Sequence, residues 1–193
     1  MTITTPLEAG CFYHIYNRGN NSELIFREPA NYHYFLKLMQ KYISPSVDIY
    51  AYCLLNNHFH LLVKIRQETF NLLGKINKPE QNFSNFFNAY AKSFNQKYKR
   101  TGKLFEERFK RKRIEDEFYF TEVLYYIHAN PQNHKIIKDF RNYKYSSYQN
   151  LLSCTEPNLI QEEIFDWFGG EELFKQYHAD KQKVLAEVAF FDV

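Results

Sequence analysis

The sequence predicts an α+β domain built on an antiparallel sheet. Two runs of β-favouring residues, 47–54 and 58–65, flank the short polar pair Asn56-Asn57, a tight-turn signal that indicates an antiparallel hairpin. Helix-period patterns alternate with further strand patterns before and after this hairpin. The chain has 193 residues, of which 45% are hydrophobic and 19% aromatic, so a single folded domain can bury a sizeable core.

The first strand is expected over residues 11–17, where β-favouring residues alternate before Arg18-Gly19. Pro29 suits the first turn of a helix that runs to about Tyr42. The apolar face of this helix is predicted to consist of Tyr32, Phe35, Leu36 and Met39. After the hairpin, a second helix is expected over residues 82–98, before Gly102. Its predicted apolar stripe consists of Phe83, Phe86, Phe87, Tyr90 and Phe94.

Residues 105–114 are predicted to form a fourth strand that carries exposed basic residues. Asp116 is expected to open the next helix and Pro131 to end it. The resulting order, β-α-β-β-α-β-α, is the split βαβ order of ferredoxin-like domains, whose sheet carries helices on one face. We therefore predict a ferredoxin-like domain over residues 1–150 and a helical C-terminal extension over residues 151–193.

Composition restricts the compartment and the class of partner. Three distant cysteines, Cys11, Cys53 and Cys154, fit neither a disulfide framework nor a cysteine metal site, and reduced thiols are expected. No apolar segment reaches the roughly 20 residues that span a bilayer, and no signal peptide is recognisable, which predicts a cytoplasmic protein without membrane association. Residues 92–113 are rich in lysine and arginine, with only Glu106 and Glu107 as acidic neighbours, and this pattern favours polyanion binding.

His58 and His60 lie on the second strand of the hairpin. Because side chains alternate along a strand, both imidazoles are expected on one face and Phe59 on the other. Such a pair can supply two nitrogen ligands to a metal ion, although it can equally be a packed or solvent-facing pair. A metal site therefore requires a third ligand.

Tyr126 and Asn130 are candidates for the remaining chemistry. Residues four apart lie one turn apart on the same side of a helix, so Tyr126 pairs a nucleophilic hydroxyl with a possible oxygen ligand. Neither Tyr125 nor Tyr119 has a metal-binding residue at the same spacing. The alternative is that Tyr125 and Tyr126 are core aromatics and that Asn130 caps the helix.

With these residues in place, the chain resembles the single-tyrosine transposases of the HUH endonuclease superfamily, especially the REP-associated tyrosine transposases. The resemblance covers most of residues 11–150 in the order of the family. It rests on residues 13–19 (YHIYNRG), 57–63 (NHFHLLV), 102–105 (GKLF), 108–109 (RF), 126–131 (YIHANP) and 145–148 (YSSY). One departure is Asn56, where the family often has proline; asparagine also suits a turn.

The resemblance implies that His58, His60 and Asn130 bind a divalent metal ion, Mg²⁺ or Mn²⁺, and that Tyr126 is the nucleophile. It further implies cleavage and joining of single-stranded DNA through a 5′-phosphotyrosine intermediate, on a strand or on a DNA hairpin with a single-stranded flank. The residues expected to contact DNA are Asn17, Arg18, Lys99, Arg100, Arg108, Lys110, Arg111 and Arg113. His14 is a lone histidine on the first strand, which is more often structural; the alternative is that it supports the site, and it is not counted among the metal ligands.

Two other functions stay open from the sequence. The chain could be a non-catalytic regulator that binds DNA hairpins, derived from a transposase. It could also be a metallohydrolase in which water replaces Tyr126 as the nucleophile. Whether the protein is a monomer or a homodimer is likewise open.

Overall fold

A computed structural model describes residues 5–106, 108–154 and 159–184 of the chain. Four strands form one antiparallel sheet in the order β2-β3-β1-β4. They are β1 (Phe12–Arg18), β2 (Val47–Leu54), β3 (His58–Ile65) and β4 (Lys110–Ile114). The β2–β3 hairpin has the bounds predicted from the sequence, and the predicted α+β fold class is confirmed.

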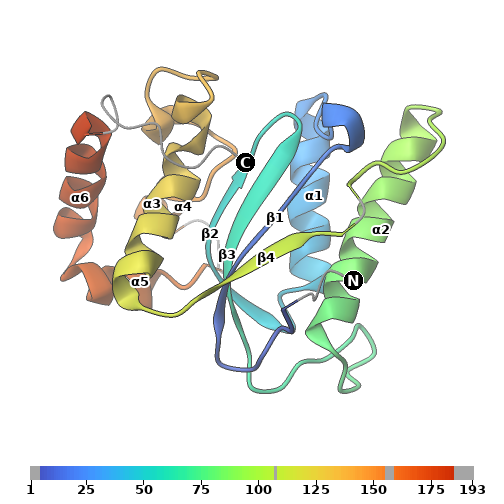
Figure 1. Cartoon of the computed structure of the whole chain (residues 1–193), viewed down its shortest axis with the longest axis horizontal. Helices are drawn as coiled ribbons and strands as arrows, with labels where there is room; N and C mark the ends of the chain where they lie inside the picture. The colour runs from blue at the N-terminus through green and yellow to red at the C-terminus, as the bar shows by residue number, and fades with distance from the viewer. Residues whose placement is uncertain (1–4, 107, 155–158, 185–193) are drawn as a thin grey trace.

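Helices lie on both sides of this sheet (Figure 1). Those described are α1 (Pro29–Tyr42), α2 (Pro79–Lys97), α3 (Glu117–Asn133), α4 (Tyr148–Ser153), α5 (Gln161–Phe168) and α6 (Glu171–Val184), with 3-10 turns η1 (Asn20–Ser22) and η2 (Phe140–Asn142). The predicted boundary at residue 150 falls within α4. Among the described residues, no helix combines the length and apolar character needed to cross a membrane.

Side-chain alternation on β3 explains why helices occupy both faces. Phe59 contacts Phe35 of α1 and Phe87 of α2, with ring centroids 5.1 and 5.3 Å apart. The next residue, His60, points to the opposite face and lies 5.5 Å from the ring of Tyr126 on α3. The expectation that helices cover one face therefore holds for α1 and α2, and is corrected for α3, which covers the histidine-bearing face.

An aromatic cluster fixes α3 over this face near the start of the helix. Phe120 lies 5.2 Å from Phe12 on β1, 5.5 Å from Tyr50 on β2 and 4.2 Å from Trp167 on α5, measured between ring centroids. Edge-on aromatic contacts of this kind stabilise packing beyond the area that they bury. The cluster fills the space between sheet and helix at one end, and Tyr126 lies further along α3, past the cluster.

The fourth strand is shorter than the predicted range of 105–114. Phe105 forms an isolated bridge with Gly19, whereas Lys110 pairs with Tyr16 in the regular ladder. Three residue steps separate Tyr16 from Gly19, but five separate Phe105 from Lys110, so the two chains cannot stay in register between these pairs. The ladder is therefore interrupted between these pairs, and β4 begins only at Lys110.

Pro131 does not end the last predicted helix, because α3 continues to Asn133. A proline removes only its own N–H donor, and here that loss falls in the last turn. The following residues restore the pattern, since the His134 N–H donates to the Asn130 carbonyl at 3.0 Å and the Ile136 N–H donates to the Pro131 carbonyl at 2.9 Å. The extra turn brings His134 close to the histidines of β3.

Gly19 is required by a close approach of the backbone. A Cβ atom at this position would lie 2.0 Å from the carbonyl oxygen of Glu23. The Gly19 N–H donates to the Asn57 carbonyl at 2.7 Å, which ties the end of β1 to the hairpin turn beside His58. Any side chain must therefore displace backbone next to the histidine pair.

We expect Gly19→Ala to lower the free energy of unfolding by about 1–3 kcal/mol, as overpacking does in other cores. Urea denaturation measures this loss, and Gly102→Ala is the matched control, since nothing lies within 4 Å of a Cβ at that position although its φ of +85° is also unfavourable. An alanine at residue 19 that costs less than one at residue 102 would contradict the steric argument.

Candidate active site

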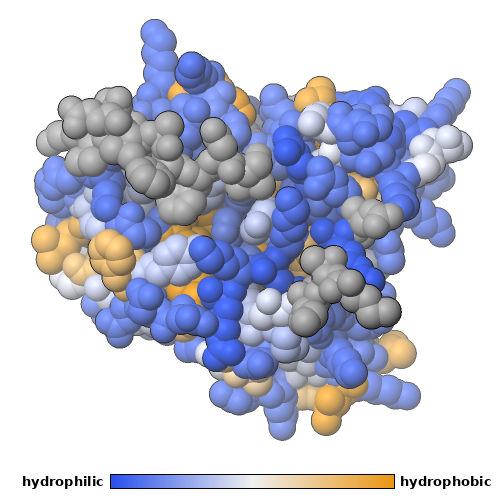
Figure 2. All heavy atoms as spheres, viewed as in Figure 1, coloured by the Kyte–Doolittle hydropathy of each residue, from blue (hydrophilic) through white to orange (hydrophobic). Residues whose placement is uncertain are grey.

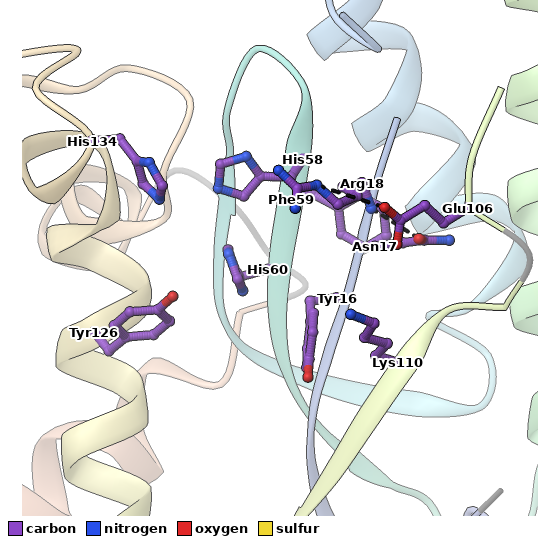
Figure 3. A pocket seen from close by; sticks show the side chains of 10 residues that line it. All are labelled: Tyr16, Asn17, Arg18, His58, Phe59, His60, Glu106, Lys110, Tyr126 and His134. Atoms are coloured by element: carbon purple, nitrogen blue, oxygen red, sulfur yellow. Dashed lines mark hydrogen bonds and ion pairs between the residues drawn. The ribbon is translucent and has the colours of Figure 1, made fainter. Parts of the chain in front are cut away.

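The structure brings the predicted catalytic side chains together in a cleft between the sheet and α3 (Figure 3). This histidine cleft is lined by Tyr16, Asn17, Arg18, His58, Phe59, His60, Glu106, Lys110, Tyr126 and His134. It is narrow, with a volume of about 30 Å³. Asn130 is not among the lining residues; it is fully buried and contacts His58.

Tyr125 and Tyr126 occupy different environments. The hydroxyl of Tyr126 points into the cleft toward the histidines of β3 (Figure 3), and the ring lies 5.5 Å from His60 and 6.1 Å from His14 between centroids. The ring of Tyr125 packs instead against Phe140, 5.9 Å away, and burial raises the pKa of its phenol well above the usual value. Of the two, only Tyr126 faces the histidines.

His60 is held by His14 from the neighbouring strand. The His60 Nδ1 and His14 Nε2 atoms are 2.9 Å apart, and His60 Nε2 is buried without a hydrogen-bond partner. If His60 Nδ1 carries the proton and donates to His14, then His60 Nε2 keeps a lone pair directed at the cleft. This is how an outer hydrogen bond orients a metal-binding imidazole in other proteins.

His58 presents its own Nε2 in the same way. Its Nδ1 lies 2.7 Å from Asn57 Oδ1, an acceptor, so Nδ1 is the protonated nitrogen and Nε2 has a lone pair. That Nε2 faces Asn130 Oδ1 at 3.3 Å, and Asn130 Nδ2 is buried without a partner. With the amide in this orientation two acceptor atoms face each other; a cation or a proton between them, or a turn of the amide that lets Nδ2 donate to His58 Nε2, relieves this.

The histidines are neutral near pH 7. Burial lowers the pKa of His58 to about 4, with a smaller contribution from the nearby His134. Burial likewise lowers the pKa of His14 to about 3 and that of His60 well below its usual value. A neutral imidazole is the form that binds metal ions.

These observations fit a divalent cation held by His58 Nε2, His60 Nε2 and Asn130 Oδ1. In the described part of the chain, no group of three or more His, Cys, Asp or Glu residues is arranged to hold a metal ion. The fit therefore depends on an amide oxygen as the third ligand, and on the unpartnered nitrogen of His60 and the facing acceptors of His58 and Asn130. A set with only three protein ligands leaves positions open for oxygen atoms of a substrate.

Arg18 and Lys110 are the predicted DNA-contacting cations that line the cleft, together with Asn17. Arg18 lies 3.8 Å from Glu106, and both side chains are partly exposed. The surface on this side of the molecule is largely hydrophilic, and hydrophilic residues gather over the region of β4 (Figure 2). Positive charge thus borders the cleft on the sheet side.

The other predicted cations lie elsewhere. Arg111 and Arg113 alternate with Lys110 along β4 and therefore face the other side of the sheet, and the rest lie outside this strand. Three of them contact carboxylates: Arg111 with Glu80, Arg113 with Glu8 and Arg100 with Glu23. Lys99 is exposed in the turn after α2. Arg108 and Arg111 line a larger groove of about 700 Å³ beside α2, together with Lys103, Phe105 and Phe109.

Three residues near the cleft were not selected from the sequence. His134 lies 4.8 Å from His58 between ring centroids, and was missed because the helix was expected to end at Pro131. Tyr16 and Lys112 project to the same face as His60, as Tyr16 pairs directly with His60 across the strands. Tyr16 lies two residues after His14, and Lys112 lies two residues after Lys110. Since alternate residues of a strand share a face, this spacing could have indicated both from the sequence.

The C-terminal helix α6 is joined to α3 by a buried chain of hydrogen bonds. His178 Nδ1 donates to the Phe174 carbonyl at 2.8 Å, so its Nε2 accepts from His128 Nδ1 at 3.0 Å. His128 Nε2 then accepts from Ser147 Oγ at 2.9 Å, which in turn accepts the Tyr52 N–H at 2.9 Å. The extension is thereby fixed to the helix that carries Tyr126.

These buried hydrogen bonds predict that the folded protein loses stability in acid. Burial lowers the pKa of His178 to about 4, whereas an unfolded histidine titrates near 6.5. Between these values the unfolded chain binds a proton that the folded chain does not, so the stabilisation is present above about pH 6.5 and is lost as pH falls toward 4. The titratable groups that face His178 are His128, Tyr125, Tyr148 and Tyr177.

We expect the free energy of unfolding to fall by about 3 kcal/mol from His178 alone between pH 7 and pH 4. Urea denaturation across this range measures the loss. His178→Gln keeps hydrogen-bonding capacity without a titrating group and should show a shallower pH dependence. An equal dependence in parent and variant would show that His178 does not carry the effect.

Comparison with known proteins agrees with this geometry. An antiparallel sheet that presents a neutral histidine pair to a tyrosine on a covering helix is the arrangement that the sequence resemblance to transposases implies. The family described as "Transposase IS200 like" matches residues 8–130, well over half of the chain, and the protein belongs to this family. The resemblance identified from the sequence motifs is thereby confirmed.

A solved structure shares the fold. It is described as the structure of a REP-associated tyrosine transposase bound to a REP hairpin. The two chains are 15% identical with a TM-score of 0.57, and the match covers 79% of this chain and 85% of that chain. No curated protein sequence is significantly similar to the chain. The helices α5 and α6 lie beyond the segment that matches the family.

Proposed function

We propose that the protein is an endonuclease and strand transferase for single-stranded DNA that depends on a divalent cation and uses Tyr126 as its nucleophile. The observation that carries the proposal is that the Tyr126 hydroxyl points toward His60, whose Nε2 is unpartnered, in one narrow cleft (Figure 3). A phosphodiester that enters the cleft would meet the nucleophile on the α3 side and the imidazoles on the sheet side.

In the proposed reaction, the phenolic oxygen of Tyr126 attacks phosphorus and forms a tyrosine–phosphate ester at the 5′ end of the downstream DNA fragment. The bond from phosphorus to the 3′ oxygen breaks, and the proton lost by the phenol is balanced by the proton gained on the 3′ hydroxyl. Because one phosphoester replaces another, a 3′ hydroxyl of a second strand can reverse the step without ATP. Cleavage and joining therefore use the same residues.

His58, His60 and Asn130 would hold Mg²⁺ or Mn²⁺, and that ion would supply charge neutralisation on the phosphate. The ligand residues remain fixed because their outer partners, His14 and Asn57, orient both rings before substrate arrives. A phenol with an ordinary pKa near 10 is mostly protonated at neutral pH, so it needs this polarised phosphate to react.

DNA binding is proposed to use both faces of β4. Arg18 and Lys110, which line the cleft, would contact the phosphates that flank the reacting one. The larger groove beside α2, with Arg108 and Arg111 among its lining residues and phenylalanines interleaved, suits a further stretch of backbone or a hairpin stem. The similar solved protein is bound to a REP hairpin, which supports the hairpin as a test substrate.

We expect one sequence to be cut at least about tenfold faster as a single strand or as a flanked hairpin than as perfect duplex, because pairing and stacking must be broken to admit a duplex phosphate into the narrow cleft. The source of the sequence should be the DNA that flanks the gene. Labelled substrates on a denaturing gel show both cleavage and covalent adduct. Equal or faster cutting of the duplex would contradict the proposal.

A further inference from the structure

A second cavity adjoins the histidine cleft and has no role in the chemistry described above. This side pocket has a volume of about 180 Å³, against about 30 Å³ for the cleft. It is lined by His14, Tyr16, Lys112, Tyr119, Glu122, Val123 and Tyr126. Tyr16 and Tyr126 line both cavities, so a ligand in the side pocket would lie directly next to a phosphate in the cleft.

The walls of the side pocket combine flat rings with one cation and one anion. Tyr16 projects from β1 and Tyr119 from α3, while Val123 supplies apolar surface between them. Lys112 Nζ lies 4.5 Å from the ring centroid of Tyr119 and has no carboxylate partner within the described residues. A planar ligand that both donates and accepts hydrogen bonds would match these walls.

Glu122 is fixed in one orientation by the C-terminal extension. Its Oε1 accepts from the Tyr177 hydroxyl at 2.7 Å and lies 2.5 Å from Lys181 Nζ, and both partners belong to α6. Its Oε2 has no hydrogen-bond partner among the residues described by the structure. One carboxylate oxygen is thus anchored, and the other remains available as an acceptor at the pocket wall.

We propose that the side pocket binds the unpaired nucleobase next to the scissile phosphate and selects bases that carry an exocyclic amine. Glu122 Oε2 accepts a hydrogen bond from that amine, as carboxylates do from cytosine N4, and Lys112 donates to an acceptor of the base. The rings of Tyr16 and Tyr119 provide the stacking surface. Thymine, which lacks an exocyclic amine, leaves the carboxylate oxygen unpaired.

The base subsite rests on the proposed function. It deepens that function by assigning base selection to Glu122, which α6 holds in place at the wall of the side pocket. Binding and cleavage nevertheless test it separately. In a chelator, binding of short dC, dA and dT homopolymers to the full chain measures base preference without any reaction. With Mg²⁺, cleavage of a flanking single strand measures the same preference at the reacting position.

We expect dC and dA homopolymers to bind at least about threefold more tightly than dT, and Glu122→Gln to remove most of this difference. Glu117→Gln is the matched control, because it makes the same change at an exposed residue of α3 that does not line the side pocket. An abasic residue next to the cut should slow cleavage about tenfold, in line with the loss of one stacked base. Abasic residues several nucleotides away should have smaller effects.

Each outcome separates the two proposals. If Tyr126-dependent cleavage occurs but neither the adjacent base nor Glu122→Gln changes it, the side pocket is not a base subsite and the proposed function stands. If no strand is cleaved but binding shows the amine preference and its loss in Glu122→Gln, the subsite stands without the nuclease. If Glu117→Gln alters base preference as much as Glu122→Gln, the effect comes from the loss of one negative charge on α3 and the selection proposal is overturned.

Discussion

Replacing Tyr126 by phenylalanine should abolish the covalent protein–DNA adduct and lower the rate of cleavage by at least about a thousandfold. The change removes only the oxygen that faces His60 across the cleft, and the ring keeps its edge contacts with His14 and His60. Folding and DNA binding should therefore stay close to those of the parent. A denaturing gel of protein mixed with labelled single-stranded substrate shows the adduct directly.

Tyr125→Phe is the matched control, since it removes the same atom from the adjacent residue. Tyr125 packs against Phe140 and Tyr177 on the far side of α3, and we expect its loss to leave the adduct intact. The pair of variants also separates three functions. A protein that binds but never cleaves is a regulator, and one that cleaves equally well after Tyr126→Phe uses water. Persistence of the adduct in Tyr126→Phe would refute the nucleophile assignment.

Patterns of neighbouring residues in the sequence were sufficient to predict most of the sheet and to bring the histidine pair, Tyr126 and Asn130 near one another. The hairpin bounds follow from the turn at Asn56-Asn57, and the placement of His58 and His60 on one face follows from the period of a strand. The spacing of Tyr126 and Asn130 along a helix likewise places both near the histidines. Each of these features depends on residues close together in the chain.

The errors arose where distant segments decide the outcome. Which face α3 would cover depends on the Phe120 cluster with Phe12 and Trp167, and no single segment contains that information. The interruption before β4 depends on where Gly19 bridges Phe105. The contact of Arg111 with Glu80 of α2, 31 residues earlier, could not be predicted either, and the prediction that Arg111 contacts DNA stays a prediction. Such pairings need the assembled fold.

Substituting alanine for His60 should abolish cleavage, with a loss of at least about a thousandfold, and leave most DNA binding in place. The reason is that its unpartnered Nε2 would bind the proposed cation, whereas we expect phosphate affinity to come from the basic residues around the cleft. His58→Ala should behave alike, and a chelator should reproduce both losses in the parent. His33→Ala, at an exposed histidine of α1, is the control.

Because His60 is fully buried, its alanine variant can also lose stability. A second measurement, the effect of Mn²⁺ on the melting temperature, therefore accompanies the cleavage assay. Mn²⁺ should raise the melting temperature of the parent and of His33→Ala, but not that of His60→Ala or His58→Ala, since a ligand stabilises only the state that binds it. His14→Gln should retain folding, because glutamine can still accept from His60 Nδ1, and should keep the Mn²⁺ effect in part. If a folded His60→Ala variant is stabilised by Mn²⁺ and cuts DNA at the parental rate, the cation binds elsewhere and the histidine cleft does not perform the proposed reaction.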